Sequence, residues 1–128
     1  MARVLALCAD LMFGSRIAAQ VQEAGGQLEL LPDAAAVTAR LEGPAQQRPT
    51  VVLVDLTSDP EQGIGLVAGL AGEGPRTLGF YSHVEADVRE RAERAGFDLV
   101  VPRSRMAREG AALVERLLED SAPPRAGG

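Results

Sequence analysis

Residues 50–56 of the chain read TVVLVDL, and this segment is the clearest β-strand of the sequence. Its side chains are mostly β-branched or apolar, a composition that favours strands. The apolar residues follow one another without alternating with polar ones, so we expect both faces of the strand to be buried. A carboxylate, Asp55, stands near its end. A strand of this kind predicts the interior of a parallel sheet that helices cover on both faces.

Strand-like and helix-like segments alternate on either side of this strand. The other predicted strands are residues 3–8, 27–31, 77–82 and 97–101. Apolar residues at helical spacing and capping residues predict helices at residues 12–24, 33–41, 63–71, 85–95 and 106–119. A polar loop at residues 43–49 and a turn at residues 57–62 complete the pattern. Five strands alternating with five helices predict an α/β fold, with a five-stranded parallel sheet and helices on both faces.

Length and composition agree with a single domain. The chain has 128 residues, of which 46% are apolar but only 3% are aromatic, so Ala, Val, Leu and Ile must build the core. We expect the domain to span residues 1–120. Residues 121–128, SAPPRAGG, have the composition of a disordered tail.

The charged residues argue against a nucleic-acid partner. There are 18 acidic and 13 basic residues, which gives a formal net charge of −5. Nucleic-acid binding needs a concentrated positive field instead. All the basic residues are arginine, and the chain contains no lysine.

The N-terminal segment and the single cysteine predict a cytoplasmic protein. Cys8 has no second cysteine with which to form a disulfide, in agreement with a reducing compartment. The first apolar stretch is too short for a signal peptide and soon meets Asp10. No apolar run is long enough to span a membrane, so we expect no membrane association.

Polar residues stand at the ends of four predicted strands. In an open parallel sheet, ligands bind outside the carboxyl ends of the strands. The candidate site residues are therefore Asp10, Asp55, Tyr81 or Ser82, and Arg103. Two neighbouring carboxylates raise each other's pKa unless a cation joins them, and Mg²⁺ prefers such oxygen ligands. A strand-end aspartate also often caps a helix or forms a turn, and the residues alone leave both alternatives open.

Two segments make the sequence similar to the receiver domains of bacterial response regulators, over residues 3–118. They are residues 8–26, CADLMFGSRIAAQVQEAGG, and residues 53–63, LVDLTSDPEQG. The resemblance implies the flavodoxin-like strand order 2-1-3-4-5. It also implies that Asp55 is the phosphorylated aspartate, that Asp10 binds Mg²⁺, and that Thr57 lends a backbone carbonyl to the metal. Gly63 falls on a turn glycine of these domains.

Three positions depart from the receiver pattern. Receivers carry two acids after the first strand, but here the first of them is Ala9. The hydroxyl residue that receivers place at the end of the fourth strand falls on Tyr81, or on Ser82 after a shift of one residue. The lysine that follows their fifth strand falls on Arg103, and a guanidinium does not reproduce the geometry of an ammonium.

These departures favour one function and leave a second one open. The first is an atypical, stand-alone receiver-like signalling module with a degenerate phosphorylation site, acting by protein–protein interaction through its last two strands and helices. The alternative is a working single-domain response regulator, phosphorylated on Asp55. It would need Mg²⁺ at Asp10, Asp55 and Thr57, and Arg103 in place of lysine. The partner, a kinase or a downstream effector, is not identified by the sequence, and the helix at residues 106–119 also permits a homodimer.

Other chemistries fit the residues less well, and we expect no enzyme. A phosphatase-like nucleophile at Cys8 would need an arginine at position 14, which is a glycine. A dinucleotide fingerprint would have to follow the first strand, whereas the glycines at residues 63–65 follow the third. A small anion pocket is a further hypothesis, lined by Tyr81, His83 and Arg103.

Overall fold

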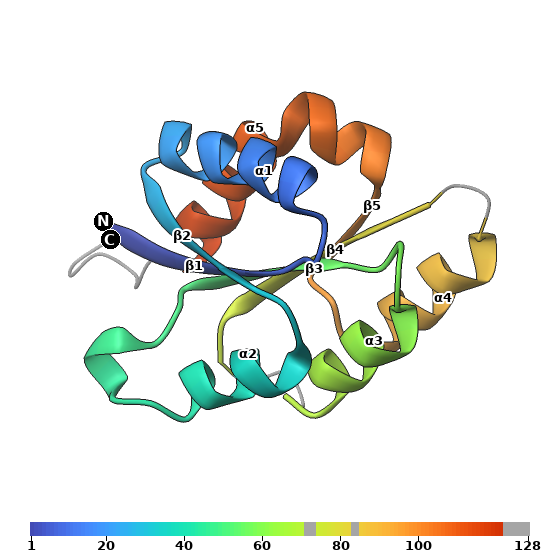
Figure 1. The fold of residues 1–128 in the computed structure, drawn as a ribbon, viewed down its shortest axis with the longest axis horizontal. Helices are drawn as coiled ribbons and strands as arrows, with labels where there is room; N and C mark the ends of the chain where they lie inside the picture. The colour runs from blue at the N-terminus through green and yellow to red at the C-terminus, as the bar shows by residue number, and fades with distance from the viewer. Residues whose placement is uncertain (71–73, 83–84, 122–128) are drawn as a thin grey trace.

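Five parallel strands form one sheet in the computed structural model, which describes residues 1–70, 74–82 and 85–121 (Figure 1). The strands are β1 (Ala2–Leu7), β2 (Gly26–Leu31), β3 (Val51–Asp55), β4 (Arg76–Tyr81) and β5 (Leu99–Pro102). The helices are α1 (Leu11–Glu23), α2 (Ala34–Leu41), α3 (Pro60–Ala68), α4 (Ala86–Ala95) and α5 (Arg103–Ser121), and the short 3-10 helix η1 (Ala45–Gln47) precedes β3. The strand order is β2-β1-β3-β4-β5, so the predicted fold class and order are confirmed.

The helices form two layers around the sheet, with α1 and α5 on one face and α2, α3 and α4 on the other (Figure 1). Each layer has its own apolar cluster. Ile17 and Met106 belong to the cluster under α1 and α5, and Val37 and Val88 belong to the cluster on the opposite face. All five residues of β3 are buried, as the sequence TVVLVDL predicts for a central strand.

Contacts at particular residues hold the helices in place on each face of the sheet. Gln20 of α1 donates its side-chain amide to the carbonyl oxygens of Met106 and Ala107 in α5, at 3.1 and 3.0 Å. On the opposite face, Gly63 lies inside α3 and not in a turn. A Cβ atom at this glycine would come within 2.8 Å of the Leu56 side chain and also meet Val54. The absent side chain therefore lets α3 lie directly on β3.

Two helices begin three residues earlier than the sequence predicts. Helix α3 begins at Pro60 and not at residue 63, because Asp59 caps it by accepting a hydrogen bond from the Gln62 amide (3.2 Å) and proline suits the first helical turn. Helix α5 begins at Arg103 and not at residue 106, because β5 continues to Pro102 and no loop follows it. Arg103 and Ser104, which we expected in a loop, are therefore fixed on the first turn of α5.

The expected C-terminal boundary of the domain, at residue 120, stays a prediction. Helix α5 includes Ser121, the first residue of the expected tail. Residues 122–128 lie outside the described residues, so the disordered tail stays a prediction. Within residues 1–70, 74–82 and 85–121, no helix is long and apolar enough to cross a membrane.

Candidate functional site

The predicted site residues meet at the carboxyl edge of the sheet, towards the right of Figure 1. A continuous hydrogen-bond network joins four of them through Cys8. In order, it comprises Arg103, Asp10, Cys8, Asp55 and Thr57. Parallel pairing of β1 with β3 explains their proximity: Leu7 is paired with Val54, so the residues that follow in the two strands lie side by side. The structure thus brings together Asp10, Asp55, Thr57 and Arg103, and their roles in phosphorylation or metal binding stay predictions.

Asp10 is the N-cap of α1. Its Oδ1 accepts hydrogen bonds from the backbone amides of Met12 (3.0 Å) and Phe13 (3.1 Å). Its Oδ2 forms an ion pair with the Nη2 of Arg103 at 3.1 Å. The hydrogen bond from Phe13 lowers the pKa of Asp10 most, and the Met12 amide and Arg103 lower it further. The helix-capping role that the sequence left open is therefore present, together with a cation at the second oxygen.

Asp55 is nearly buried, with a relative exposure of 9%, and the chain supplies its hydrogen-bond donors. Oδ1 accepts from the Thr57 amide (2.8 Å) and from the Thr57 hydroxyl (2.6 Å). The Cys8 thiol lies 3.5 Å from Oδ2 and also 3.5 Å from the Asp10 carbonyl oxygen. Each oxygen of this carboxylate therefore has a donor of the same chain within hydrogen-bonding distance.

Cys8 is a buried thiol and not an exposed nucleophile. Burial raises its pKa to about 11, and the charge of Asp55 adds to this effect, although the hydrogen bond to the Asp10 carbonyl opposes it. A thiol with a raised pKa is protonated at neutral pH and reacts slowly. These features agree with the sequence-based argument against a phosphatase-like nucleophile at Cys8.

Arg103 connects the first turn of α5 to the N-terminus of α1. Besides its ion pair with Asp10, its guanidinium carbon lies 4.3 Å from the centre of the Phe13 ring. That ring in turn packs on Phe80 of β4, with 5.2 Å between the ring centres. The planar guanidinium of arginine combines stacking on an aromatic face with hydrogen bonds in its own plane.

Tyr81 and Ser82 lie beside this group, at the end of β4. Tyr81 is the last residue of the strand, is paired with Pro102, and is only 6% exposed in the cluster beneath α4. The hydrogen bond of Arg89 with Glu93 raises the pKa of Arg89 most, and Tyr81 raises it further.

Ser82 follows the strand, and its carbonyl oxygen accepts a hydrogen bond from the Glu85 amide at 2.9 Å. His83 lies outside the described residues, so the predicted pocket of Tyr81, His83 and Arg103 stays a hypothesis.

A pocket of about 740 Å³ opens between the N-terminal ends of α1 and α5. Its lining includes four of the predicted site residues, Thr57, Tyr81, Ser82 and Arg103. The other lining residues are Met12, Phe13, Arg16, Glu85, Ser104 and Ala107. Met12 is 87% exposed at its rim, next to Leu11 at 73%. Sequence reasoning missed Arg16, although it stands one helical turn after Met12 and therefore on the same face of α1.

The donors around the two aspartates do not suit a Mg²⁺ ion. A metal at Asp10 would compete with Arg103 for Oδ2, while Oδ1 holds the first turn of α1. At Asp55, Thr57 and Cys8 occupy the corresponding positions. Among the described residues, no three His, Cys, Asp or Glu side chains are grouped as metal ligands. Arg103 therefore supplies a cation to Asp10, and each carboxylate oxygen of Asp10 and Asp55 already has a donor.

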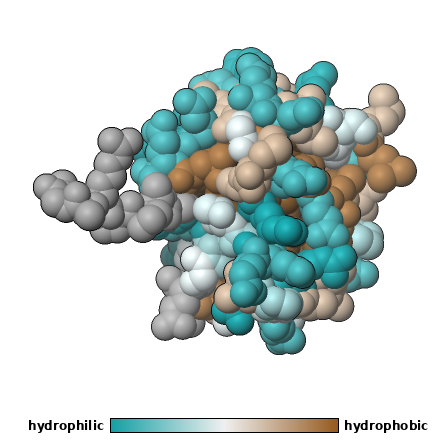
Figure 2. Space-filling view, turned by 90° about the vertical axis from the view of Figure 1, so that its left-hand side faces the viewer, coloured by the Kyte–Doolittle hydropathy of each residue, from teal (hydrophilic) through white to brown (hydrophobic). Residues whose placement is uncertain are grey.

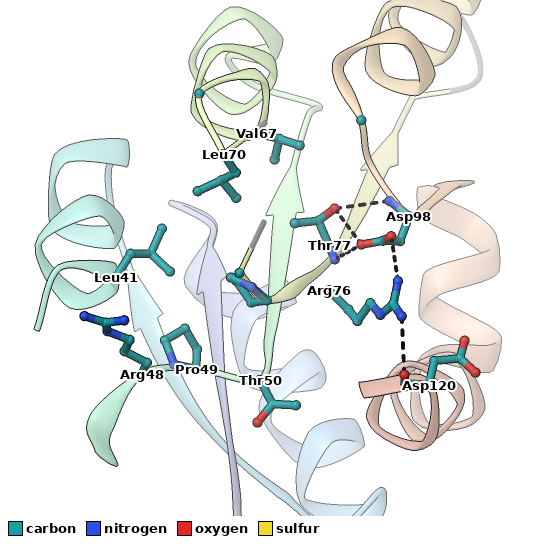
Figure 3. Close-up of a pocket in the computed structure, with 14 residues that line it drawn as sticks. Leu41, Arg48, Pro49, Thr50, Val67, Leu70, Arg76, Thr77, Asp98 and Asp120 are labelled. Atoms are coloured by element: carbon teal, nitrogen blue, oxygen red, sulfur yellow. Dashed lines mark hydrogen bonds and ion pairs between the residues drawn. The ribbon is translucent and has the colours of Figure 1, made fainter. Parts of the chain in front are cut away.

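A second pocket of about 740 Å³ lies at the opposite edge of the sheet (Figure 3). There Asp98 accepts a hydrogen bond from the Thr77 amide (2.7 Å) and pairs with Arg76 (3.3 Å), which also donates to the Asp120 carbonyl oxygen (3.3 Å). Figure 2 shows apolar residues that reach the surface of this face between hydrophilic ones. The polar contacts join the beginnings of β4 and β5 to the end of α5, a structural role.

Solved structures of response regulators have the same fold. The receiver protein from Burkholderia phymatum has a TM-score of 0.79 at 22% identity, over 97% of this chain and 100% of that chain. The Francisella response regulator 1452 receiver domain has a TM-score of 0.76 at 15% identity, over 95% and 100%. The Mn²⁺-bound form of response regulator Rcp1 has a TM-score of 0.72 at 15% identity, over 98% and 100%.

Comparisons of sequence alone find no relative. No protein-family model matches the chain, and no curated protein sequence matches it. The structural similarity nevertheless extends over nearly the whole chain. The chain therefore has the fold of response-regulator receiver domains.

Proposed function

We propose that the chain is an atypical receiver-like signalling module of the cytoplasm, which acts by binding a partner protein and is not an enzyme. In this proposal the phosphorylation site is degenerate, so Asp55 does not serve as an efficient phosphoacceptor. The fold supports the signalling class, because its solved neighbours are response regulators. The hydrogen bonds around the aspartates support the loss of phosphorylation.

The arrangement of Asp55 is the observation that carries the proposal. An aspartate that accepts a phosphoryl group must present one carboxylate oxygen to the donor. Here Oδ1 accepts two hydrogen bonds from Thr57, and Oδ2 faces the Cys8 thiol. Whichever oxygen attacked, its contact with Thr57 or with Cys8 would have to weaken or rearrange before phosphoryl transfer. Such contacts with the ionised ground state oppose the reaction instead of promoting it.

Three further residues support the same conclusion. Ala9 contributes no carboxylate to the edge. Tyr81, at the end of β4, has its ring packed beneath α4. Arg103 pairs with Asp10 and therefore has less freedom to contact a phosphoryl group on Asp55. Ser82 is the one hydroxyl residue directly after β4 that lines the pocket.

The proposed partner surface comprises β4, α4, β5 and α5. The exposed side of α4 carries ion pairs between Arg89 and Glu93 (2.9 Å) and between Arg94 and Glu90 (2.7 Å). Polar surfaces of this kind are typical of non-obligate interfaces and of their rims. A reversible protein contact therefore suits this surface better than permanent assembly.

Incubation with a small phosphodonor tests the proposal. The purified chain is mixed with acetyl phosphate or phosphoramidate and Mg²⁺, and intact mass is recorded under acidic conditions that preserve acyl phosphates. We expect no gain of a phosphoryl group on Asp55. A gain in the wild type that is absent from Asp55→Asn would contradict the proposal. It would support the alternative, a working response regulator with Mg²⁺ at Asp10, Asp55 and Thr57.

A further inference from the structure

Arg103 lies across the carboxyl edge of the sheet. It belongs to the helix that follows β5, whereas its partner Asp10 follows β1, and β3 and β4 separate these strands in the sheet. The ion pair therefore links residues that follow two strands not adjacent to each other in the sheet. Because α5 begins directly at Arg103, the residue has a helical backbone and not that of a loop.

Two different contacts hold the guanidinium in this place. Nη2 lies 3.1 Å from Asp10 Oδ2, and the guanidinium carbon lies 4.3 Å above the Phe13 ring. The contacts use different parts of the group, since the ion pair lies along an N–H direction and the stacking uses the face of the plane. Asp10 is itself fixed by the amides of Met12 and Phe13. Arg103 is thus positioned by groups that belong to one helix terminus.

The local charge is the second part of the argument. Asp10 and Asp55 contribute two negative charges, and the site lacks a third because residue 9 is alanine. Arg103 neutralises one of the two directly. A divalent ion at Asp10 would have to displace the guanidinium or lie beside a positive charge. Either arrangement weakens the binding of the ion.

We infer that Arg103 is the resident cation of this site: it supplies to Asp10 the positive charge that a divalent ion would supply, and it keeps such ions away. The inference rests on the proposed function, because it explains why the edge of the sheet carries two aspartates without Mg²⁺-dependent chemistry. The negative charge of Asp10 is then always balanced by a side chain of the same protein. The charge of the site therefore does not depend on the concentration of Mg²⁺.

Metal titration of an arginine variant tests the inference. Arg103→Met removes the charge but keeps an unbranched apolar side chain that can lie on Phe13. Mn²⁺ is the probe, and its binding is followed by paramagnetic broadening of amide signals or by calorimetry. We expect no saturable binding to the wild type at millimolar Mn²⁺. Arg103→Met should bind saturably, with a dissociation constant at least about tenfold below the highest Mn²⁺ concentration at which the wild type shows no saturation, the effect expected of removing one positive charge a few ångströms from a divalent ion.

Two control variants locate the effect. Arg105→Met removes an arginine from the same turn of α5, where it pairs with Glu109 at 3.4 Å on the surface. It should behave like the wild type. Addition of Asp10→Asn to Arg103→Met should abolish the binding that was gained. If Arg103→Met is poorly folded by circular dichroism, Arg103→Gln replaces it with the same expectation.

The results that overturn the inference are specific. Saturable Mn²⁺ binding by the wild type, as tight as that of the variant, would overturn it, and so would a folded variant that gains no affinity. Phosphorylation of Asp55 in the phosphodonor experiment would overturn the proposed function instead. The two failures are distinguishable, because one is read from metal affinity and the other from intact mass.

Discussion

Cys8, Asp10 and Asp55 lie together because β1 and β3 are adjacent and parallel. Sequence patterns predict this much, since both strands are apolar runs that end beside a carboxylate. They do not predict that the Cys8 thiol lies 3.5 Å from Asp55, or that Arg103 pairs with Asp10. These contacts depend on side-chain direction and on the residue at which α5 begins. A shift of three residues in the predicted start of that helix placed Arg103 on a loop.

The thiol of Cys8 provides a prediction at the scale of one residue. Burial raises its pKa to about 11, so the reactive thiolate is roughly a thousandth of the population at pH 8. Reaction of the folded chain with a disulfide reagent should therefore be slow at pH 8 and accelerate as the pH approaches 11. Absorbance of the released thiolate measures the rate, and circular dichroism confirms that the chain stays folded.

The unfolded chain is the matched control for this measurement. In urea the same thiol should react rapidly, with a pH midpoint near the ordinary value of about 8.5. A folded chain whose rate also has its midpoint near that value would show that Cys8 is exposed. The hydrogen-bond arrangement around Asp55 would then need revision.

Among the helices, α3 shows best what a sequence pattern misses. The glycines at positions 63 and 65 suggest a weak helix after a turn, yet the helix includes both and begins at Pro60. Capping by Asp59 was readable from the sequence in principle, because aspartate before proline is a common helix start. The reason for Gly63 was not readable. The reason is that a side chain at position 63 would collide with the Val54 and Leu56 side chains. The spacing of apolar residues within the helix does not reveal this contact with another element.

Substitution of Gly63 tests this packing at the scale of the element. A Cβ atom there would overlap the buried side chains of Val54 and Leu56. Gly63→Ala should therefore lower the free energy of unfolding by about 1–3 kcal/mol, as expected for an overpacked core. Urea denaturation followed by circular dichroism measures the change.

Gly65 offers a control within the same helix. A Cβ atom at this residue meets nothing within 4 Å. Gly65→Ala should raise the free energy of unfolding by about 0.5–1 kcal/mol, because alanine restricts the unfolded chain and favours the helix. Equal effects of the two substitutions would show that helix propensity alone, and not contact with β3, determines the outcome.

Across the whole molecule, the alternation of strands and helices predicts the fold class without reference to any functional residue. The site is less predictable because it depends on contacts between residues that are far apart in sequence, such as Asp10 and Arg103. The same distinction applies to α5. Its apolar residues at helical spacing predict a helix, but the pattern cannot show whether the sheet or a second copy of the chain covers them.

The structure favours the sheet as the cover of that apolar face, and this leads to a prediction for the assembly state. Leu113, Val114 and Leu117 are 4%, 0% and 2% exposed within one chain, so a homodimer through these residues would have to open the core. Light scattering at micromolar concentrations should therefore give the mass of one chain. Ala112 lies on the exposed side of α5. A dimer in the wild type that Ala112→Arg dissociates would contradict the prediction, because it would place the interface on the outer face of α5 and not on its buried stripe.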